Sequence, residues 1–234
     1  MSDALDFDLF RCITFDCYGT LIDWETGLLN ALRPIVAAHG VKAADQELLK
    51  LYGELEAAEQ RRPYRRYREV LKAVVFGLGE RLSFRASLEQ AESLPESIAQ
   101  WQPFPDTVEA LRRLSAKYKL AIISNIDDDL FAHSAKLLQV SFEAVTTAQQ
   151  AQAYKPSHKI FELAFQKLGL PREHILHAGQ SLYHDVAPAR ELGLHSVWVN
   201  RASRRPGAGA TISAAVKPDL EVNSLKALAD RALG

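Results

Sequence analysis

The stretch Cys12–Thr20, which reads CITFDCYGT, begins as a short apolar, β-rich segment and ends abruptly on the carboxylate of Asp16. A glycine turn follows directly at Tyr18-Gly19. Open α/β sheets present reactive groups where a strand ends in such a turn. A carboxylate held there can attack carbon or phosphorus and form a covalent ester or acyl phosphate. The stretch therefore predicts that Asp16 is a nucleophile, and the alternative is a turn or helix-cap residue.

Composition sets the class of protein. The chain has 234 residues, of which 47% are hydrophobic and 24% charged, as is ordinary for a soluble globular protein with one large domain or an inserted one. A net charge of −1 argues against a general nucleic-acid binder. The two cysteines, Cys12 and Cys17, offer no disulfide framework, and Met1–Phe10 lacks a basic signal-peptide region. No apolar run approaches the roughly 18 residues of a membrane helix, so we expect a cytoplasmic protein.

A long helical stretch follows the first strand, and apolar residues recur in it at helical spacing. Helices are predicted around Leu28–Val36 (with a kink at Pro34), Leu48–Leu55, Val70–Leu78 and Ser87–Gln100. From Pro103 onward, strand and helix patterns alternate. Strands are predicted at Leu120–Ser124, near Val145, and at Ile175–Ala178, Ser196–Val199 and Asp219–Val222. Helices are predicted at Thr107–Lys117, from Asp129, at Ser157–Leu168 and Asp185–Leu192, and from Ser224, with a loop at Ser203–Thr211.

This order predicts an α/β fold with a parallel sheet covered by helices on both faces. Residues 1–23 and 103–234 are expected to form the α/β core, and residues 24–102 an inserted helical domain. An insertion directly after the first strand rises over the carboxyl ends of the strands. We therefore expect it to act as a lid over the site.

Four polar clusters follow predicted strands or precede helices along this edge: Asp16, Ser124-Asn125, Lys155-Pro156 and Gly179–Asp185. Hydroxyl and amide groups can donate to an anionic ligand, and an ammonium group can neutralise a carboxylate. Each has a structural alternative, such as a turn residue, a solvated lysine or a helix N-cap. Together these alternatives are less favoured, because a parallel sheet brings all four clusters to one edge.

The ordered set resembles the haloacid dehalogenase superfamily of hydrolases, with a helical cap between the first and second motifs. The resemblance covers nearly the whole chain and implies a Rossmann-like core with Asp16 as the nucleophile. Most members are Mg-dependent phosphatases with two further acids. Tyr18 and Gln180 stand at those positions here. Magnesium prefers anionic oxygen ligands, and an alkoxide leaving group needs a proton donor, so a phosphatase is the minor alternative.

The motif is similar to that of the metal-independent 2-haloacid dehalogenases. The implied reaction is attack of Asp16 on C2 of a small 2-substituted carboxylic acid with inversion, after which water hydrolyses the aspartyl ester. The resemblance implies no metal and no cofactor. It implies catalytic roles for Asp16, Lys155 and Asp185, and substrate-binding roles for Tyr18, Thr20, Ser124, Asn125 and Ser181.

At three places the sequence differs from the 2-haloacid dehalogenases, and these differences bear on the leaving group. The dehalogenases carry a halide-binding arginine where Glu47–Lys50 has none, and Phe161 and Leu182 replace a tyrosine and an asparagine. The sequence is closer to a branch that opens the ring of azetidine-2-carboxylate. A nitrogen leaving group needs a proton, for which Tyr183 or His184 are candidates. Halide is the first choice and ring opening the second.

Other features have competing interpretations. The run Arg61–Arg68 predicts a solvated helix face, and an arginine reaching the substrate carboxylate is the alternative. Asp127–Asp129 predicts at least one helix cap rather than a metal site, although Asp127 lies close enough in sequence to Ser124 to enter the site. Ser181 lacks the setting of a serine nucleophile.

Aromatic residues lie at both ends of the inserted helical segment. Trp24, Trp101 and Phe104 flank the ends of the insertion and predict hinge packing, with a pocket wall as the alternative. The expected partner is a small carboxylic acid, without nucleic acid or membrane, and a homodimer is left open. A non-enzymatic alternative is a retired catalyst that only binds a small anion.

Overall fold

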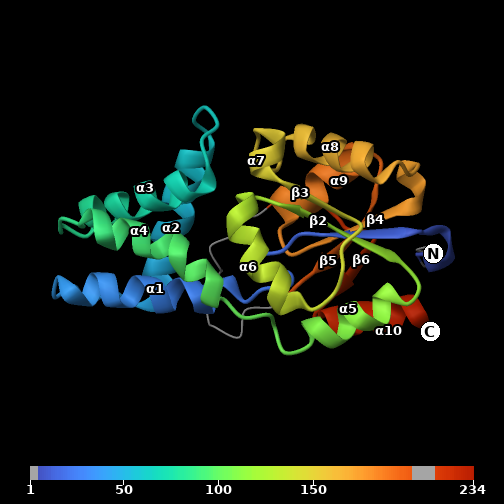
Figure 1. The fold of residues 1–234 in the computed structure, drawn as a ribbon, viewed down its shortest axis with the longest axis horizontal. Coiled ribbons are helices and arrows are strands. Elements are labelled where there is room, and N and C mark those ends of the chain that lie inside the picture. The colour runs from blue at the N-terminus through green and yellow to red at the C-terminus, as the bar shows by residue number, and fades with distance from the viewer. Residues whose placement is uncertain (1–4, 202–213) are drawn as a thin grey trace.

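The computed structural model describes residues 5–201 and 214–234, and its centre is a six-stranded parallel sheet (Figure 1). The strand order is β3-β2-β1-β4-β5-β6. The strands are β1 (Cys12–Phe15), β2 (Lys119–Ser124), β3 (Ala144–Thr147), β4 (Ile175–Gly179), β5 (His195–Val199) and β6 (Leu220–Val222). This confirms the predicted α/β class. The loop predicted at Ser203–Thr211 lies outside the described residues.

Strand β1 lies in the middle of the sheet because both of its edges are paired. Ile13 is in register with Leu120 of β2 on one side and with Leu176 of β4 on the other. All four residues of β1 are buried, as is typical of a strand covered on both faces. The chain winds outward from β1 to β3 and then returns to β4 on the opposite side of β1. Ligands of open α/β sheets bind at the carboxyl ends of strands beside such a reversal.

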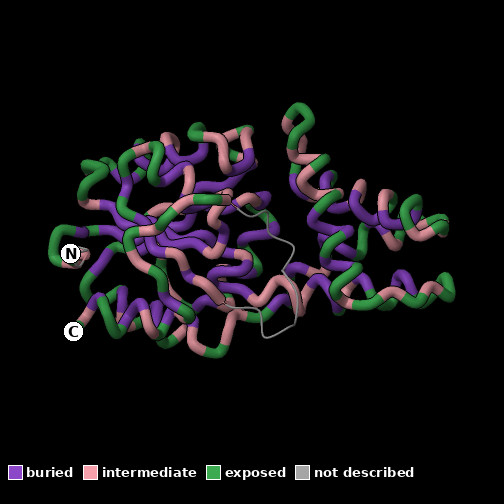
Figure 2. The backbone as a smooth tube through the Cα atoms, turned by 180° about the vertical axis from the view of Figure 1, so that it is seen from behind, coloured by how far each residue is buried: buried purple, intermediate pink, exposed green. Residues whose placement is uncertain are grey.

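Helices cover both faces of the sheet. In Figure 1, α8 and α9 lie above the strands, and α5 and α10 lie below them. The bounds are α5 (Thr107–Ser115), α6 (Asp128–Leu138), α7 (Ala148–Ala151), α8 (His158–Leu168), α9 (Ala187–Glu191) and α10 (Leu225–Leu233). Figure 2 shows that the buried backbone is concentrated in the strands and the inner faces of these helices. The sheet is therefore the rigid base on which the strand-end residues are held.

Residues 24–102, called the helical block below, lie beside the carboxyl ends of the strands (Figure 1). The block comprises α1 (Trp24–Ala38), α2 (Asp45–Gln60), α3 (Tyr67–Arg81), α4 (Leu88–Ser97) and the 3₁₀ turn η2 (Ile98–Gln100). Helix α1 begins at Asp23, whose side chain accepts a hydrogen bond from the Thr26 amide, and it continues through Pro34. Helix α4 begins with a capping box between Ser87 and Gln90.

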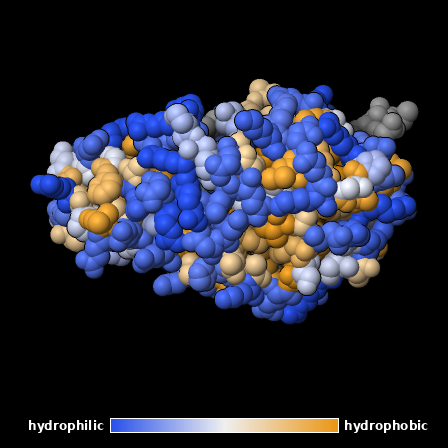
Figure 3. All heavy atoms as spheres, turned by 45° about the horizontal axis from the view of Figure 1, so that its top comes forward, coloured by the Kyte–Doolittle hydropathy of each residue, from blue (hydrophilic) through white to orange (hydrophobic). Residues whose placement is uncertain are grey.

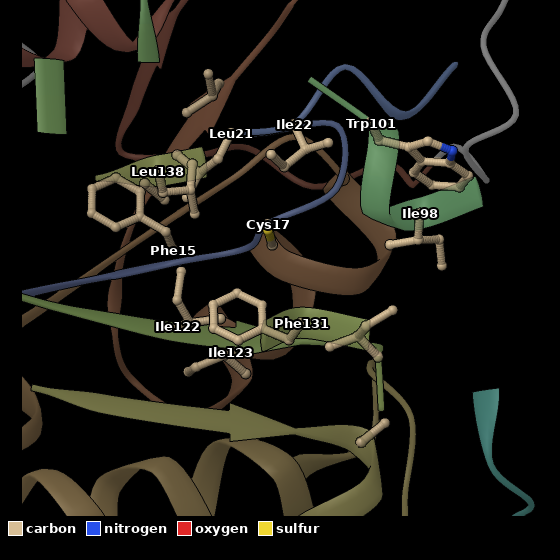
Figure 4. Close-up of a cluster of buried hydrophobic side chains, with 14 of the residues drawn as sticks. Phe15, Cys17, Leu21, Ile22, Ile98, Trp101, Ile122, Ile123, Phe131 and Leu138 are labelled. Carbon is tan, nitrogen blue, oxygen red and sulfur yellow. The ribbon is translucent and has the colours of Figure 1, made fainter. Parts of the chain in front are cut away.

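The block joins the core through two adjacent connections. The Asp23 amide donates to the Gln102 carbonyl at 2.9 Å, and Ile22 forms an antiparallel bridge with Pro103. Figure 4 shows apolar side chains from β1, β2, α6 and the end of the block in one cluster. Trp101 packs its ring edge-on against Tyr18, with centroids 5.9 Å apart, which confirms the junction packing predicted for this tryptophan.

One face of the molecule shows a predominantly polar surface. The face in Figure 3 is mostly hydrophilic, with hydrophobic residues in separate small patches. Throughout residues 5–201 and 214–234, every helix is too short or too polar to cross a bilayer.

Candidate active site

The turn after β1 fixes the position of Asp16. Its backbone amide donates to the Ala178 carbonyl of β4 at 3.0 Å, which continues the sheet by one residue. Gly19 has φ of +95°, a conformation that favours glycine, and a Cβ there would lie 2.8 Å from the Trp24 ring nitrogen. The turn is closed by the Leu21 amide, which donates to Cys17 at 2.8 Å. Local sequence therefore holds Asp16 at the strand end.

Both carboxylate oxygens of Asp16 accept hydrogen bonds from the protein. Lys155 Nζ donates to Oδ1 at 2.8 Å, and the Thr20 hydroxyl donates to Oδ2 at 2.8 Å. The residue is only 8% exposed. Burial and then the charge of Asp185 raise the pKa of Asp16, although Lys155 acts in the opposite direction.

Lys155 is the positive centre of the site. Its ammonium group donates to Asp16 Oδ1 at 2.8 Å, to Asp185 Oδ1 at 2.7 Å and to the Ile123 carbonyl at 3.0 Å. Burial acts to lower the pKa of Lys155, but the charges of the two carboxylates outweigh it, so the pKa is raised. Because an ammonium group has three protons, all of its donors are already engaged.

Asp185 lies on a single π-helical turn, η4 (Leu182–Val186), which follows β4. The expected helix at Asp185–Leu192 therefore begins with a wider turn, and α9 starts only at Ala187. Such turns are frequent at functional sites. At Gly179 a Cβ would lie 2.4 Å from Asp185 Cγ, so glycine leaves the space that this carboxylate occupies.

The Asp185 carboxylate is held by charge and by hydrogen bonds. Besides Lys155, the Ser181 amide donates to Oδ2 at 3.1 Å, and His177 Nε2 lies 3.3 Å from Oδ1. Burial acts to raise the pKa of Asp185, but Lys155 and then His177 outweigh it and lower the pKa. Asp185 is therefore ionised at neutral pH, which suits it to orient a water molecule.

Asn125 supports the loop that carries Lys155. Its Oδ1 accepts from the Lys155 amide at 2.7 Å, and its Nδ2 donates to the Lys155 carbonyl at 3.2 Å. The Ser124 hydroxyl is buried and has no hydrogen-bond partner among the described residues. A buried polar group of this kind requires a partner, and a ligand oxygen would supply one. Ser181 Oγ accepts from the His184 amide at 3.0 Å.

Of two predicted substrate-binding residues in the turn after β1, one lies outside the cavity and one lines it. Thr20 is fully buried and does not line the cavity, because its hydroxyl lies between Asp16 and the Gln180 amide. The prediction that Thr20 contacts substrate is therefore corrected, because its hydroxyl supports the Asp16 carboxylate. Tyr18 does line the cavity, but its hydroxyl is 2.9 Å from Ser134 Oγ on α6.

A cavity of about 80 Å³ opens above Asp16. Its core side, called the floor below, consists of Asp16, Tyr18, Ser124, Asn125, Lys155, Gln180, Ser181, His184 and Asp185. Its other side, called the wall, comes from the helical block and consists of Trp24, Glu56, Gln60 and Tyr67. Trp24 therefore lines the cavity, in agreement with the alternative considered for it. The remaining wall residues are absent from the sequence prediction.

Glu56 is the wall residue that the sequence could have revealed. It follows Tyr52 by four residues, on the apolar stripe of α2 that includes Leu48 and Leu49. An acid on such a stripe faces the interior rather than water.

On the floor, burial lowers the pKa of His184 to about 4, so its imidazole is neutral at neutral pH. His184 is therefore a poor candidate for the proton donor considered from the sequence.

The three consecutive acids near α6 do not enter the cavity. Asp127 is fully buried, and its carboxylate accepts from the amides of Tyr67 and Arg68, each at 3.0 Å. The hypothesis that Asp127 enters the site is therefore wrong, and this carboxylate instead binds the start of α3. Asp128 accepts from the Thr147 hydroxyl at 2.6 Å.

The arginine run connects the helical block to the core. Arg66 and Arg68 contact opposite oxygens of Asp129, at 2.9 and 2.8 Å. The run precedes α3 and enters only its first turn, so the prediction of a solvated helix face is corrected. None of its arginines lines the cavity above Asp16. Arg61 and Arg62 line a neighbouring cavity instead.

The donor set does not fit the magnesium ion that the phosphatase alternative requires. The cavity offers two core carboxylates, Asp16 and Asp185, and both are bonded to Lys155. Neutral Tyr18 and Gln180 stand at the other positions. Within the described parts of the chain, no three His, Cys, Asp or Glu side chains are grouped to hold a metal ion.

Comparison with known families identifies the chain. Residues 10–193 match the family described as haloacid dehalogenase-like hydrolase. The chain belongs to the haloacid dehalogenase-like hydrolases. This haloacid dehalogenase-like hydrolase is 28% identical over 232 residues to an (S)-2-haloacid dehalogenase from Pseudomonas sp. (strain YL), covering 95% of this chain and 94% of that protein.

Other relatives extend the comparison. A glyceraldehyde 3-phosphate phosphatase from Methanothermobacter thermautotrophicus is 26% identical over 201 residues, covering 82% of this chain and 86% of that protein. The structure of L-2-haloacid dehalogenase from Xanthobacter autotrophicus, with chloropropionic acid covalently bound, superposes with a TM-score of 0.80 at 20% identity. That match covers 96% of this chain and 99% of the other, so the hydrolase shares its fold over nearly the whole length.

Proposed function

We propose that this hydrolase cleaves the bond between C2 and a leaving group in a small 2-substituted carboxylic acid, without a metal ion. Asp16 attacks C2, the bond to the leaving group breaks with its electron pair, and an aspartyl ester forms. Water then attacks the Asp16 carbonyl and releases the 2-hydroxy acid. Halide is the first leaving group to consider, because the relatives named above include 2-haloacid dehalogenases.

One observation carries this proposal. The Asp16 carboxylate lies at the floor of a small cavity, between Lys155 and Thr20, with neutral Tyr18 and Gln180 where a phosphatase would need acids. The unpartnered Ser124 hydroxyl supplies a donor for the substrate carboxylate. Asp185 is placed to orient the hydrolytic water, and Lys155 to keep Asp16 ionised.

The helical block acts in this proposal as a cap that excludes water from the ester-forming step. Residues 24–102 supply the wall, and residues 1–23 and 103–234 supply the floor. We place the reaction in the cytoplasm, where the free thiols of Cys12 and Cys17 would stay reduced. The partner is a small carboxylic acid rather than nucleic acid, in keeping with the net charge of −1.

The test is a reaction in heavy-oxygen water with 2-chloropropionate under single-turnover conditions. We expect the peptide that contains Asp16 to gain heavy oxygen, and we expect chelator to leave the rate unchanged. If the protein is instead a phosphatase, it should hydrolyse phosphate esters, and chelator should abolish that activity. Absence of label during turnover would exclude the covalent route.

Opening of a strained nitrogen ring, as in azetidine-2-carboxylate, is the second candidate. The observation that favours it is an acid, Glu56, in the wall, where a departing halide would meet no cation among the described lining residues. Release of an amine is therefore to be assayed beside release of halide.

A further inference from the structure

Glu56 is a half-buried carboxyl group that the attack of Asp16 described above does not use. It lies on α2 and lines the same cavity as Asp16, from the opposite side. Its Oε1 accepts hydrogen bonds from Tyr67 at 2.5 Å and from Tyr52 at 3.1 Å, and the two hydroxyls lie 2.9 Å apart. Among the described residues, no hydrogen bond reaches its second oxygen, Oε2. That oxygen is therefore available to a molecule in the cavity.

Charge in the cavity is distributed unevenly between its two sides. Lys155 is the only cation among the described lining residues, and its three donors are engaged on the floor. In the described part of the chain, the wall contains no arginine or lysine, but only Glu56 with Trp24, Gln60 and Tyr67. A leaving group that departs as an anion toward the wall gains no ion pair there. A group that carries positive charge gains one with Glu56.

The environment of Glu56 allows it to hold a shared proton. Burial raises the pKa of Glu56, while the hydrogen bonds from Tyr67 and Tyr52 act in the opposite direction. Without a ligand the group therefore tends to keep its proton more than an exposed glutamate does. A bound ammonium group favours the ionised form, so the proton moves according to what occupies the cavity.

We propose that Glu56 Oε2 binds the substituent on C2 of the substrate and selects one that leaves as an amine. This inference rests on the proposed attack of Asp16 and names the group opposite it. The substrate class is a small cyclic amino acid whose ring nitrogen is bonded to C2. Asp16 forms the new bond to C2, and the C2–N bond breaks with its electron pair going to nitrogen. The nitrogen, already protonated against Glu56, leaves as a neutral amine tethered to the same molecule.

The test compares Glu56→Gln with the matched control Glu54→Gln on the same helix. Glu54 pairs with Arg81 at the surface and does not line the cavity. For each protein, kcat/KM is measured with azetidine-2-carboxylate and with 2-chloropropionate. We expect E56Q to lose at least about 100-fold with the amine substrate and to retain or gain rate with the halide substrate. E54Q should match wild type with both.

The pH profile separates a role in binding the leaving group from a merely structural one. With 2-chloropropionate, the wild-type rate should fall as Glu56 ionises with rising pH, and E56Q should lack this fall. Tyr67→Phe removes a hydrogen bond that lowers the pKa of Glu56, so the fall should move to higher pH. Equal losses with both substrates in E56Q, or an unchanged pH profile, would overturn the role of Glu56. Failure of wild type to form an Asp16 ester with either substrate would instead overturn the proposed function.

Discussion

The floor and the wall of the cavity differ in how their charged groups are paired. On the floor, Asp16, Lys155 and Asp185 satisfy one another, and each is held by backbone groups or strand-end residues. On the wall, Glu56 has both of its hydrogen bonds on one oxygen. In the proposed reaction, the floor determines how the bond is attacked, and the wall determines which bond is attacked.

The largest expected effect is on turnover, and it comes from replacing Asp16 on the floor. Asp16→Asn keeps the shape of the side chain but removes the nucleophilic charge. We expect turnover to fall by at least ~10⁴-fold with every substrate. Steady-state kinetics and intact-mass measurement of the ester check this result. Substantial turnover by the variant would show that the floor does not carry the attack.

A second change tests the balance of charge on the floor. Lys155→Met leaves two buried carboxylates without their shared cation, and breaking such a pair costs ~3–5 kcal/mol of unfolding free energy. Urea unfolding measures that loss. Glu56→Gln on the wall should cost much less, because it leaves no charge unpaired. Similar losses for the two variants would contradict the distinction between floor and wall.

A third change concerns the contact that holds the two sides together. Asp127→Ala leaves the amides of Tyr67 and Arg68 without their acceptor. We expect a loss of ~1–3 kcal/mol in unfolding free energy, measured with urea. Asp129→Ala is the matched control, since its ion pairs are about half exposed and should contribute at most ~1 kcal/mol. A larger loss for the control would refute the anchoring role of Asp127.

The smallest expected effect is a shift in the pH dependence of ester formation on Asp16. Since the pKa of Asp16 is raised, formation of the ester should decline toward acid at a higher pH than for an ordinary aspartate. The charge of Asp185 contributes to this rise, so Asp185→Asn should move the decline to lower pH. Ester formation followed by mass spectrometry in a single turnover isolates this step from hydrolysis. An unmoved decline would show that the two carboxylates do not interact.

Most of the floor could be predicted from sequence because each of its groups follows a strand in a parallel sheet. Asp16 follows β1, Ser124 ends β2, and the turn after β4 carries Asp185. One strand order brings these three ends together. Thr20 shows the limit of this reasoning. Its motif places it near Asp16, but only the turn geometry shows that its hydroxyl donates to the Asp16 carboxylate and not to a ligand.

The wall could not be predicted in the same way. Glu56 meets Tyr67 because α2 and α3 pack together, and helical periodicity does not fix which helices pair. The contact made by the arginine run cannot be predicted for the same reason. Its partner Asp129 lies in α6, far along the chain, and the sequence contains no local signal of that contact.

The two adjacent connections between block and core have a practical consequence. The chain leaves at Asp23 and returns at Gln102, and these residues are hydrogen-bonded to each other. Exchanging the segment between them with that of a relative replaces the wall as one unit, while the backbone of the nucleophile turn is retained. The fold therefore offers a natural splice point for retargeting this hydrolase to other leaving groups.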